Sequence, residues 1–217
     1  MTVYPDVKIN LGLNILGRRL DGYHDLETLF VPFRGMGDRI DIEESDRGSI
    51  EVIGGDWDPE TDLSWRACRL LSGEFGLPPV RIVLHKAAPV GAGLGSGSAD
   101  AAFTLKALNE MFSLGLDEAA LASRAAMLGS DCPFFVYDRP MFGEGRGEKL
   151  TPCELDLSSF EIRVEVPAGV KVSTREAYSG LDLSRAGERK PLREVLSRPV
   201  EEWRGGLTND FEPSVFA

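Results

Sequence analysis

Residues 89–112 read PVGAGLGSGSADAAFTLKALNEMF, a glycine-rich stretch that passes directly into a helical pattern. The second half carries apolar residues on one helical face, namely Ala101, Ala102, Leu105, Leu108 and Phe112. The glycines therefore deliver the chain to the N-terminus of a helix. Glycine permits close approach of the backbone and positive φ, and the free amides and dipole of a helix start favour an anion. The stretch predicts a phosphate-binding loop, and a flexible glycine loop without a ligand is the alternative.

The common nucleotide-binding fingerprints do not explain this loop. The sequence contains no GxxxxGK(S/T) pattern, and the glycines at positions 91, 93, 95 and 97 are not spaced as GxGxxG. The P-loop and dinucleotide-binding interpretations therefore lose their main support, and another family of phosphate loops is needed.

Upstream of the loop, the sequence has mostly β character. Residues 7–13 alternate apolar with polar or small side chains, as in a half-buried strand, and DGYHD after them indicates a turn. Lys8 and Asn10 share the polar face of that strand. Further strands are predicted at residues 28–33, 39–43, 49–53 and 80–84, with a helix at 63–75.

Downstream of the loop, a second helix is predicted from a cap at Asp117 to an end at Gly129. Asp131 follows at once, and we expect it at a helix-to-strand junction. A strand at residues 161–166 and a helix near 174–178 begin what looks like a further α+β unit.

The order of these elements predicts an α+β protein of two domains. We place the boundary near Leu157, which gives an N-terminal domain of residues 1–157 and a C-terminal domain of residues 158–217. A polar stretch at 182–190 interrupts the second domain. The sequence shows no internal repeat and no low-complexity tract, so globular structure is expected almost throughout.

Composition narrows the possible functions. The net charge of -11 on 217 residues argues against non-specific binding to nucleic acid or a membrane surface. The three cysteines are far apart and form no CxxC pair, so neither a disulfide framework nor a zinc site is indicated, and a reducing cytoplasm is the default. No segment approaches the roughly 20 apolar residues that cross a bilayer, and a soluble protein is expected. Oligomeric state does not follow from the sequence.

The segment PVGAGLGSGSADAA closely resembles the second motif of the GHMP kinases, P-x-G-x-G-L-G-S/G-S/G. Four further stretches are similar to the branch of that family that phosphorylates a cytidine diphosphate derivative of methylerythritol, in non-mevalonate isoprenoid precursor synthesis. They are VKINLGLNILGRRLDGYHDLETLF, LGSDCPFFVYDRPMFGEGRGEKLTP, and VSTREAY with the terminal NDFEPSVF. The resemblance covers essentially the whole chain. It implies the two-domain GHMP kinase fold, with an N-terminal domain like the second domain of ribosomal protein S5 and an incomplete ferredoxin-like C-terminal domain.

The resemblance implies a role for each matched residue. It makes Asp131 the catalytic base for the substrate hydroxyl, and Lys8 the neighbour that orients that hydroxyl and offsets negative charge. Tyr23 would stack on the cytosine, His24 would hydrogen-bond to it, and Tyr178 would cover its other face, with Asn10 as a further substrate contact. Without the resemblance, Asp131 would be a helix-end surface carboxylate and Lys8 a solvated lysine. Tyr23 would then be a buried anchor and His24 a turn residue.

The resemblance also implies ATP and Mg²⁺ as cofactors. The residues expected against the phosphates are Pro89, Gly91, Gly93, Leu94, Gly95, Ser96, Gly97 and Ser98. Ser98 is the candidate hydroxyl near the metal or the phosphate. Glu144 in GEGRGE is a second acidic candidate for a metal ligand, but the motif fits an exposed turn better.

Two features depart from the family pattern. Relatives commonly carry an asparagine where this chain has Asp62, and an anion there cannot offer the donor of the amide to adenine. The chain also has no second glycine-rich segment of the G-S-G-x-x-V type, so we expect a C-terminal domain that lacks its last part. The rival functions are another GHMP kinase, acting on homoserine, mevalonate or a sugar, and a non-catalytic nucleotide-binding fragment.

Overall fold

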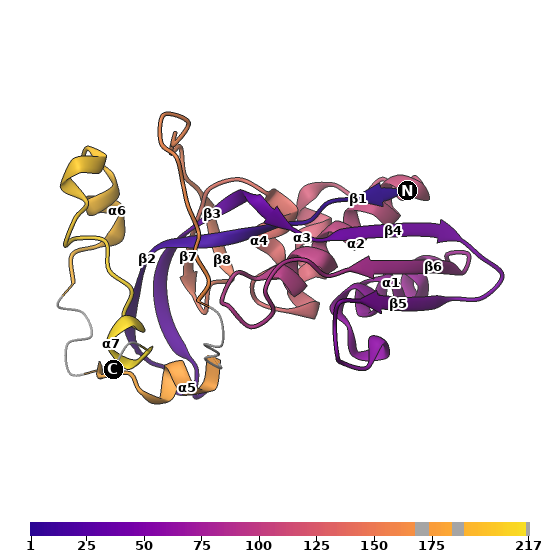
Figure 1. Ribbon diagram of the computed structural model, residues 1–217, viewed down its shortest axis with the longest axis horizontal. Helices are drawn as coiled ribbons and strands as arrows, with labels where there is room; N and C mark the ends of the chain where they lie inside the picture. Colours follow the sequence, from indigo (N-terminus) through magenta and orange to yellow (C-terminus); the bar gives the residue numbers. More distant parts are fainter. Residues whose placement is uncertain (168–173, 184–188, 216–217) are drawn as a thin grey trace. The chain divides into compact units, whose positions relative to one another are not determined.

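In this computed structural model, the described residues are 1–167, 174–183 and 189–215. The chain divides into two compact units that interleave along the sequence (Figure 1). Unit 1 comprises Met1–Lys8, Pro32–Val90 and Leu94–Arg139, and unit 2 comprises Ile9–Val31, Gly91–Gly93 and the described part of Pro140–Ala217. The domain boundary expected near Leu157 would instead divide the chain into two consecutive segments, and that boundary stays a prediction.

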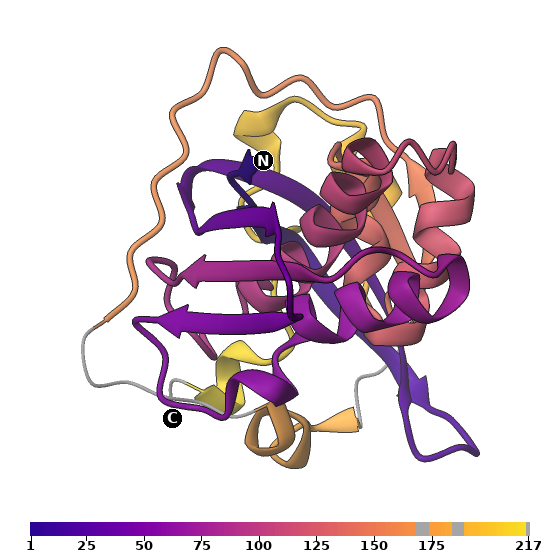
Figure 2. The same cartoon turned by 90° about the vertical axis from the view of Figure 1, so that its right-hand side faces the viewer.

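The sheet of unit 1 has four strands in the order β1-β4-β6-β5. They are β1 (Thr2–Val3), β4 (Arg39–Glu44), β6 (Val80–His85) and β5 (Ser49–Ile53), and they lie side by side in Figures 1 and 2. β4 and β6 are antiparallel, whereas β5 and β6 are parallel. Alternate residues of these strands are fully buried and form one face of the core, namely Ile40, Ile42, Ile82 and Leu84. The strands predicted at 39–43, 49–53 and 80–84 are confirmed.

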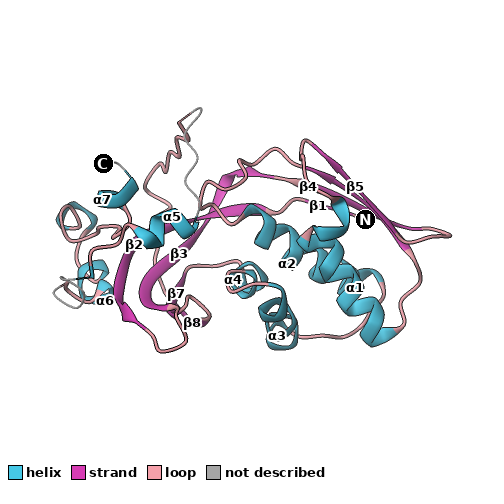
Figure 3. Ribbon diagram, turned by 90° about the horizontal axis from the view of Figure 1, so that it is seen from below, coloured by secondary structure: helices cyan, strands magenta, loops and turns pink. Residues whose placement is uncertain are grey.

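Four helices complete unit 1: α1 (Leu63–Phe75), α2 (Ser96–Met111), α3 (Glu118–Leu128) and α4 (Cys132–Tyr137). Figure 3 shows them gathered on one side of the sheet of unit 1. α2 packs against α1, and its buried face is largely built from small residues, which allow close approach. The predicted helix at 63–75 and the predicted cap at Asp117 and end at Gly129 are confirmed.

The junction expected at Asp131 is wrong. Residues Cys132–Tyr137 form helix α4 and no strand, so Asp131 lies between two helices, at the N-cap of the second one. Pro133 suits the first turn of a helix, where its missing N–H is not needed. Phe134 and Phe135 are both buried, and a short apolar run of this kind does not distinguish a buried helix from a buried strand.

Unit 2 is built on a second sheet, ordered β2-β3-β7-β8. Its strands are β2 (Asp6–Arg18), β3 (His24–Gly37), β7 (Met141–Gly145) and β8 (Lys149–Pro152), and the first two begin or end in unit 1. Two apolar clusters cover it, one around Leu29 and Phe142 and the other around Leu13 and Ile15. The alternation that predicted a strand at 7–13 is confirmed.

The remaining elements of unit 2 are short. They are the helices α5 (Thr174–Ser179), α6 (Leu192–Leu196) and α7 (Glu212–Val215), with a 3-10 helix at Val200–Glu202. A further 3-10 helix, at Pro59–Thr61, belongs to unit 1 and precedes α1. The outer edge of β2 is partly covered because Leu13 forms a parallel bridge with Asn209. The amide of Leu13 donates to the carbonyl of Thr208 at 2.8 Å, and the amide of Asp210 donates to the carbonyl of Leu13 at 2.9 Å.

The helix predicted near 174–178 is confirmed, but the strand predicted at 161–166 is wrong. Residues 161–167 carry alternating apolar side chains, yet they join neither sheet of the described chain. A strand needs a hydrogen-bonded neighbour, which the pattern of one segment does not reveal. Residues 168–173, 184–188 and 216–217 lie outside the described residues, so parts of VSTREAY, of the polar stretch and of NDFEPSVF are not placed.

None of the helices in the described ranges combines the length and apolar character that a membrane span requires.

Candidate active site

The glycine loop adopts the backbone that its sequence predicts. Gly91, Gly93 and Gly95 have φ of +75°, +73° and +72°, a left-handed conformation that side-chain-bearing residues rarely adopt. At Gly95 a side chain is disfavoured by crowding as well as by the backbone conformation, since a Cβ would lie 2.9 Å from Cζ of Phe135 and 3.4 Å from Cε of Lys8. Glycine at this position therefore brings the backbone close to the lysine.

Gly95 is also the N-cap of α2, and it offers no side-chain acceptor to the amides of the first turn. Those amides and the positive end of the helix dipole suit an anion. α2 is 16 residues long, and its first turn contains Ser96, Gly97 and Ser98. The local geometry thus agrees with a phosphate-binding helix start.

Lys8 and Asp131 form an ion pair within unit 1. Nζ of Lys8 lies 3.8 Å from Oδ2 of Asp131, and the side chains are 7% and 34% exposed, respectively. The amide of Lys8 donates to the carbonyl of Leu94 at 2.9 Å, which ties the strand to the glycine loop. Burial lowers the pKa of Lys8, and the charge of Asp131 opposes that effect. The lysine is buried rather than solvated, and the accessible member of the pair is the carboxylate.

Ser98 lies beside the residue that follows this carboxylate. Its hydroxyl is close enough to the thiol of Cys132 to influence the pKa of that thiol. Burial raises the pKa of Cys132 to about 11. Ser98 acts to lower that pKa, and the charge of Asp131 acts to raise it further. The start of α2, Lys8 and Asp131 therefore meet at one place in unit 1, and Cys132 stays a neutral thiol there.

The described residues contain no group of three or more His, Cys, Asp or Glu side chains placed to hold a metal ion. Oε2 of Glu144 lies 3.7 Å from Arg193, in keeping with an exposed turn carboxylate. A Mg²⁺ ion carried on nucleotide phosphates needs few protein ligands, so a single hydroxyl is compatible with it. The assignment of Ser98 as that hydroxyl stays a prediction.

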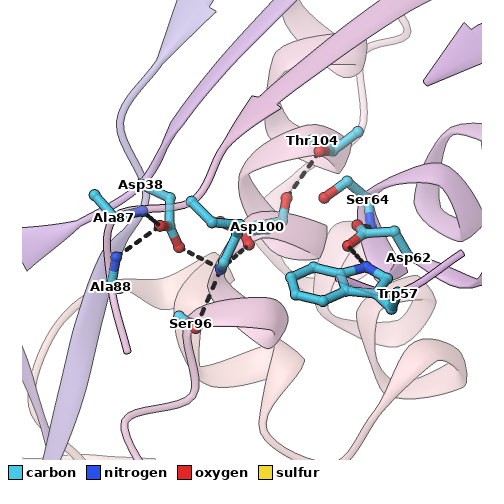
Figure 4. A network of polar contacts seen from close by, with 10 residues as sticks. Asp38, Trp57, Asp62, Ser64, Ala87, Ala88, Ser96, Asp100 and Thr104 are labelled. Carbon is cyan, nitrogen blue, oxygen red and sulfur yellow. Dashed lines mark hydrogen bonds and ion pairs between the residues drawn. The ribbon is translucent and has the colours of Figure 1, made fainter. Parts of the chain in front are cut away.

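Sequence reasoning missed a buried charge network next to the loop, which Figure 4 shows. Nζ of Lys86 lies 2.5 Å from Oδ2 of Asp38 and 2.7 Å from Oδ2 of Asp100, and it donates to Oγ of Ser96 at 3.2 Å. Oδ1 of Asp38 accepts from the amides of residues 87 and 88, at 2.7 and 2.9 Å. The network therefore holds both ends of the glycine loop.

Burial raises the pKa of Asp100 to about 8, although the neighbouring ammonium of Lys86 acts against it. Burial by itself lowers the pKa of Lys86, but the two carboxylates outweigh it and raise that pKa. Oδ1 of Asp100 has no hydrogen-bond partner in the described structure. The sequence signal for this network was a polar stripe at four-residue spacing on the buried face of α2: Ser96, Asp100 and Thr104.

Asp62 has both oxygens occupied within the protein. Oδ1 accepts from the amide of Ser64 at 2.8 Å, which caps α1, and Oδ2 accepts from Nε1 of Trp57 at 3.0 Å (Figure 4). The aspartate thus anchors a helix start, and its effect on adenine binding stays a prediction.

The residues expected around a cytosine lie in unit 2. Tyr23 and His24 close the turn between β2 and β3, where Oδ1 of Asp21 accepts from the amide of Tyr23 at 3.1 Å. The ring of His24 stacks on that of Tyr178, with the ring centroids 4.9 Å apart and an angle of 27° between the ring planes. Burial lowers the pKa of His24, and the nearby charge of Arg18 lowers it further.

Tyr23 is 56% exposed, and the guanidinium of Arg146 lies 4.7 Å from its ring centroid. It is therefore not the buried anchor that was the alternative. The structure brings His24, rather than Tyr23, against Tyr178. The side chain of Asn10 is oriented by a hydrogen bond in which its Nδ2 donates to Oγ1 of Thr28 at 2.8 Å.

Comparisons with known proteins agree with this geometry. Residues 62–139 match the family model described as "GHMP kinases N terminal domain". Proteins named 4-diphosphocytidyl-2-C-methyl-D-erythritol kinase from Bacteroides fragilis (strain YCH46) and Bacteroides thetaiotaomicron are 45% and 44% identical, and each alignment covers 100% of this chain and 80% of the relative.

A solved structure, described as a crystal structure of 4-(cytidine 5'-diphospho)-2C-methyl-D-erythritol kinase, matches with a TM-score of 0.78 and 32% identity. That match covers 100% of this chain and 77% of the other one. The GHMP kinase fold expected from the sequence is thereby confirmed. Since curated relatives match this chain from end to end, the chain belongs to the 4-diphosphocytidyl-2-C-methyl-D-erythritol kinase family of the GHMP kinases.

Proposed function

We propose that this chain transfers the γ-phosphoryl group of ATP to the 2-hydroxyl of 4-diphosphocytidyl-2-C-methyl-D-erythritol, a step of the non-mevalonate route to isoprenoid precursors. The observation that carries the proposal is the Lys8–Asp131 pair, with its partly exposed carboxylate and its lysine tied to the glycine loop. The names of the relatives that align with the whole of this chain support the choice of substrate.

The proposed chemistry asks three things of the protein. The amides at the start of α2 bind the phosphates, Asp131 accepts the proton of the attacking hydroxyl, and Lys8 orients that hydroxyl and offsets the charge. The new O–P bond forms as the bond from the γ-phosphorus to the bridging oxygen breaks, and ADP leaves with that electron pair. Mg²⁺, bound with the nucleotide, would neutralise phosphate charge, and Ser98 is the hydroxyl that we would assign to the metal or the phosphates.

We place the cytosine of the substrate at Tyr23, His24 and Tyr178, with Asn10 as a further contact. Each base–aromatic stack contributes roughly 1 to 3 kcal/mol. The lowered pKa of His24 keeps the imidazole neutral, which suits a hydrogen bond to an uncharged base. The three cysteines are free thiols, and a reducing cytoplasm is the setting that fits them.

The test is release of ADP by the purified chain with ATP, Mg²⁺ and the cytidine compound, with mevalonate and homoserine as comparison substrates. We expect release with the cytidine compound only. Release with mevalonate or homoserine instead would assign the chain to another GHMP activity. Binding of ATP without release of ADP under any condition would favour the non-catalytic alternative.

A further inference from the structure

A cavity of about 360 Å³ lies in unit 2, and two of the residues proposed to hold the base, His24 and Tyr178, form part of its wall. It is lined by Arg18, His24, Tyr178, Ser179, Leu181 and Leu183. This size falls within the usual range for small-molecule sites, roughly 300 to 1,000 Å³. Most of its wall is aromatic or apolar, and a single guanidinium provides its positive charge.

Arg18 differs from its neighbour in its ion pairs. Arg19 is paired with Asp21 at 3.0 Å and with Asp25 at 2.8 Å. No carboxylate of the described chain lies within ion-pair distance of Arg18, whose charge nevertheless reaches His24 and lowers the pKa of that imidazole. The side chain of Arg18 is exposed, and a guanidinium without an acidic partner can accept an anion such as phosphate.

A second cavity, of about 400 Å³ on the sheet of unit 1, provides a contrast. Its arginine, Arg81, is paired with Glu43 at 3.1 Å and with Glu51 at 3.0 Å, and His85 lies 3.3 Å from Asp41. The guanidinium of Arg81 is thus neutralised within the protein. Of these two cavities, the one at Arg18 has a guanidinium without a carboxylate partner among the described residues.

We propose that Arg18 recognises the diphosphate of the cytidine diphosphate substrate, while the aromatic wall of the same cavity receives the nucleoside. This inference rests on the proposed function, because it deepens the assignment of the substrate site. The planar guanidinium can donate two parallel hydrogen bonds to phosphate oxygens. Arg18 then distinguishes a charged nucleotide from the uncharged nucleoside, which His24 and Tyr178 do not.

The experiment measures the affinities of the full chain for cytidine and for cytidine diphosphate by calorimetry, without ATP. The variant is Arg18→Gln, and the matched control is Arg204→Gln, which removes the same charge from another exposed arginine of unit 2. We expect Arg18→Gln to weaken cytidine diphosphate about tenfold or more and to leave cytidine within about twofold. Arg204→Gln should leave both affinities unchanged.

Equal losses for cytidine and cytidine diphosphate, or no loss for either, would overturn the role of Arg18. Arg18→Lys provides a second check, since it keeps the charge but not the planar fork, and it should retain part of the preference for the diphosphate. Failure of the wild-type chain to bind cytidine diphosphate would instead overturn the substrate site itself. Loss of kinase activity with the binding preference intact would count against the proposed reaction and not against Arg18.

Discussion

Replacement of Asp100 by Asn should change how the stability of this protein depends on pH. Asp100 is 1% exposed, and its pKa is raised from 3.8 to about 8. The folded protein therefore keeps a proton on this carboxyl between those two values, whereas the unfolded chain releases it. The shift corresponds to a cost of about 6 kcal/mol for an ionised Asp100 in the folded state, at about 1.4 kcal/mol per pKa unit.

The sign follows from linkage. Because the folded state binds the extra proton, the free energy of unfolding falls as pH rises, by about 1.4 kcal/mol per pH unit until pH approaches the folded pKa. Asn carries no titratable proton, so the variant should lack this slope. Between about pH 5.5 and 7.5, the free energy of unfolding of Asp100→Asn should rise by about 2 to 3 kcal/mol relative to that of the wild type.

The assay is urea unfolding at several pH values, with the midpoint and the slope of each transition recorded. The control is Glu110→Gln, because Glu110 is an exposed carboxylate on the same helix, and its curve should run parallel to that of the wild type. Parallel curves for wild type and Asp100→Asn would refute the argument, since they would show that Asp100 is ionised in the folded protein across this range.

Two further predictions concern the loop and the carboxylate beside it. Asp131→Asn should lower kcat about 10² to 10⁴-fold with little change in KM, as expected for loss of a general base, and near-normal turnover in a steady-state assay would exclude that role. Gly95→Ala should cost at least about 1 kcal/mol in thermal unfolding, because φ is +72° and the new Cβ would lie 2.9 Å from Phe135. Gly97→Ala, whose Cβ would meet only Leu63 at 3.9 Å, should be neutral or stabilising, and equal effects of the two would contradict the strain argument.

Local patterns predicted much of the fold. The helix at 63–75 and the capped helix ending at Gly129 were found from periodicity and cap residues, which act over a few neighbouring positions. The prediction of a strand at 161–166 was wrong because strand pairing depends on a neighbour that is distant in sequence. The prediction of a strand after Asp131 was wrong because an apolar run as short as 132–137 is compatible with either a helix or a strand. Short-range signals do not carry either kind of information.

The candidate site divides in the same way. The glycine loop was visible in the sequence because its chemistry lies in consecutive residues. The pairing of Lys8 with Asp131 came only from resemblance, since no local pattern joins positions so far apart. The cluster of Asp38, Lys86 and Asp100 was missed altogether, although both carboxylates contact the buried ammonium of Lys86. Contacts between distant positions need either a family motif or coordinates.

The pairing of β2 with the segment around Asn209 bears on how the chain folds during synthesis. The amide of Ile15 donates to Oδ2 of Asp210 at 2.8 Å, across 195 positions of sequence. A ribosome adds roughly 5 to 20 residues per second, so the first long strand waits about 10 to 40 s for this partner. During that interval the outer edge of the strand is open to strands of other nascent chains. The order of synthesis thus sets a window in which this protein is most vulnerable to aggregation.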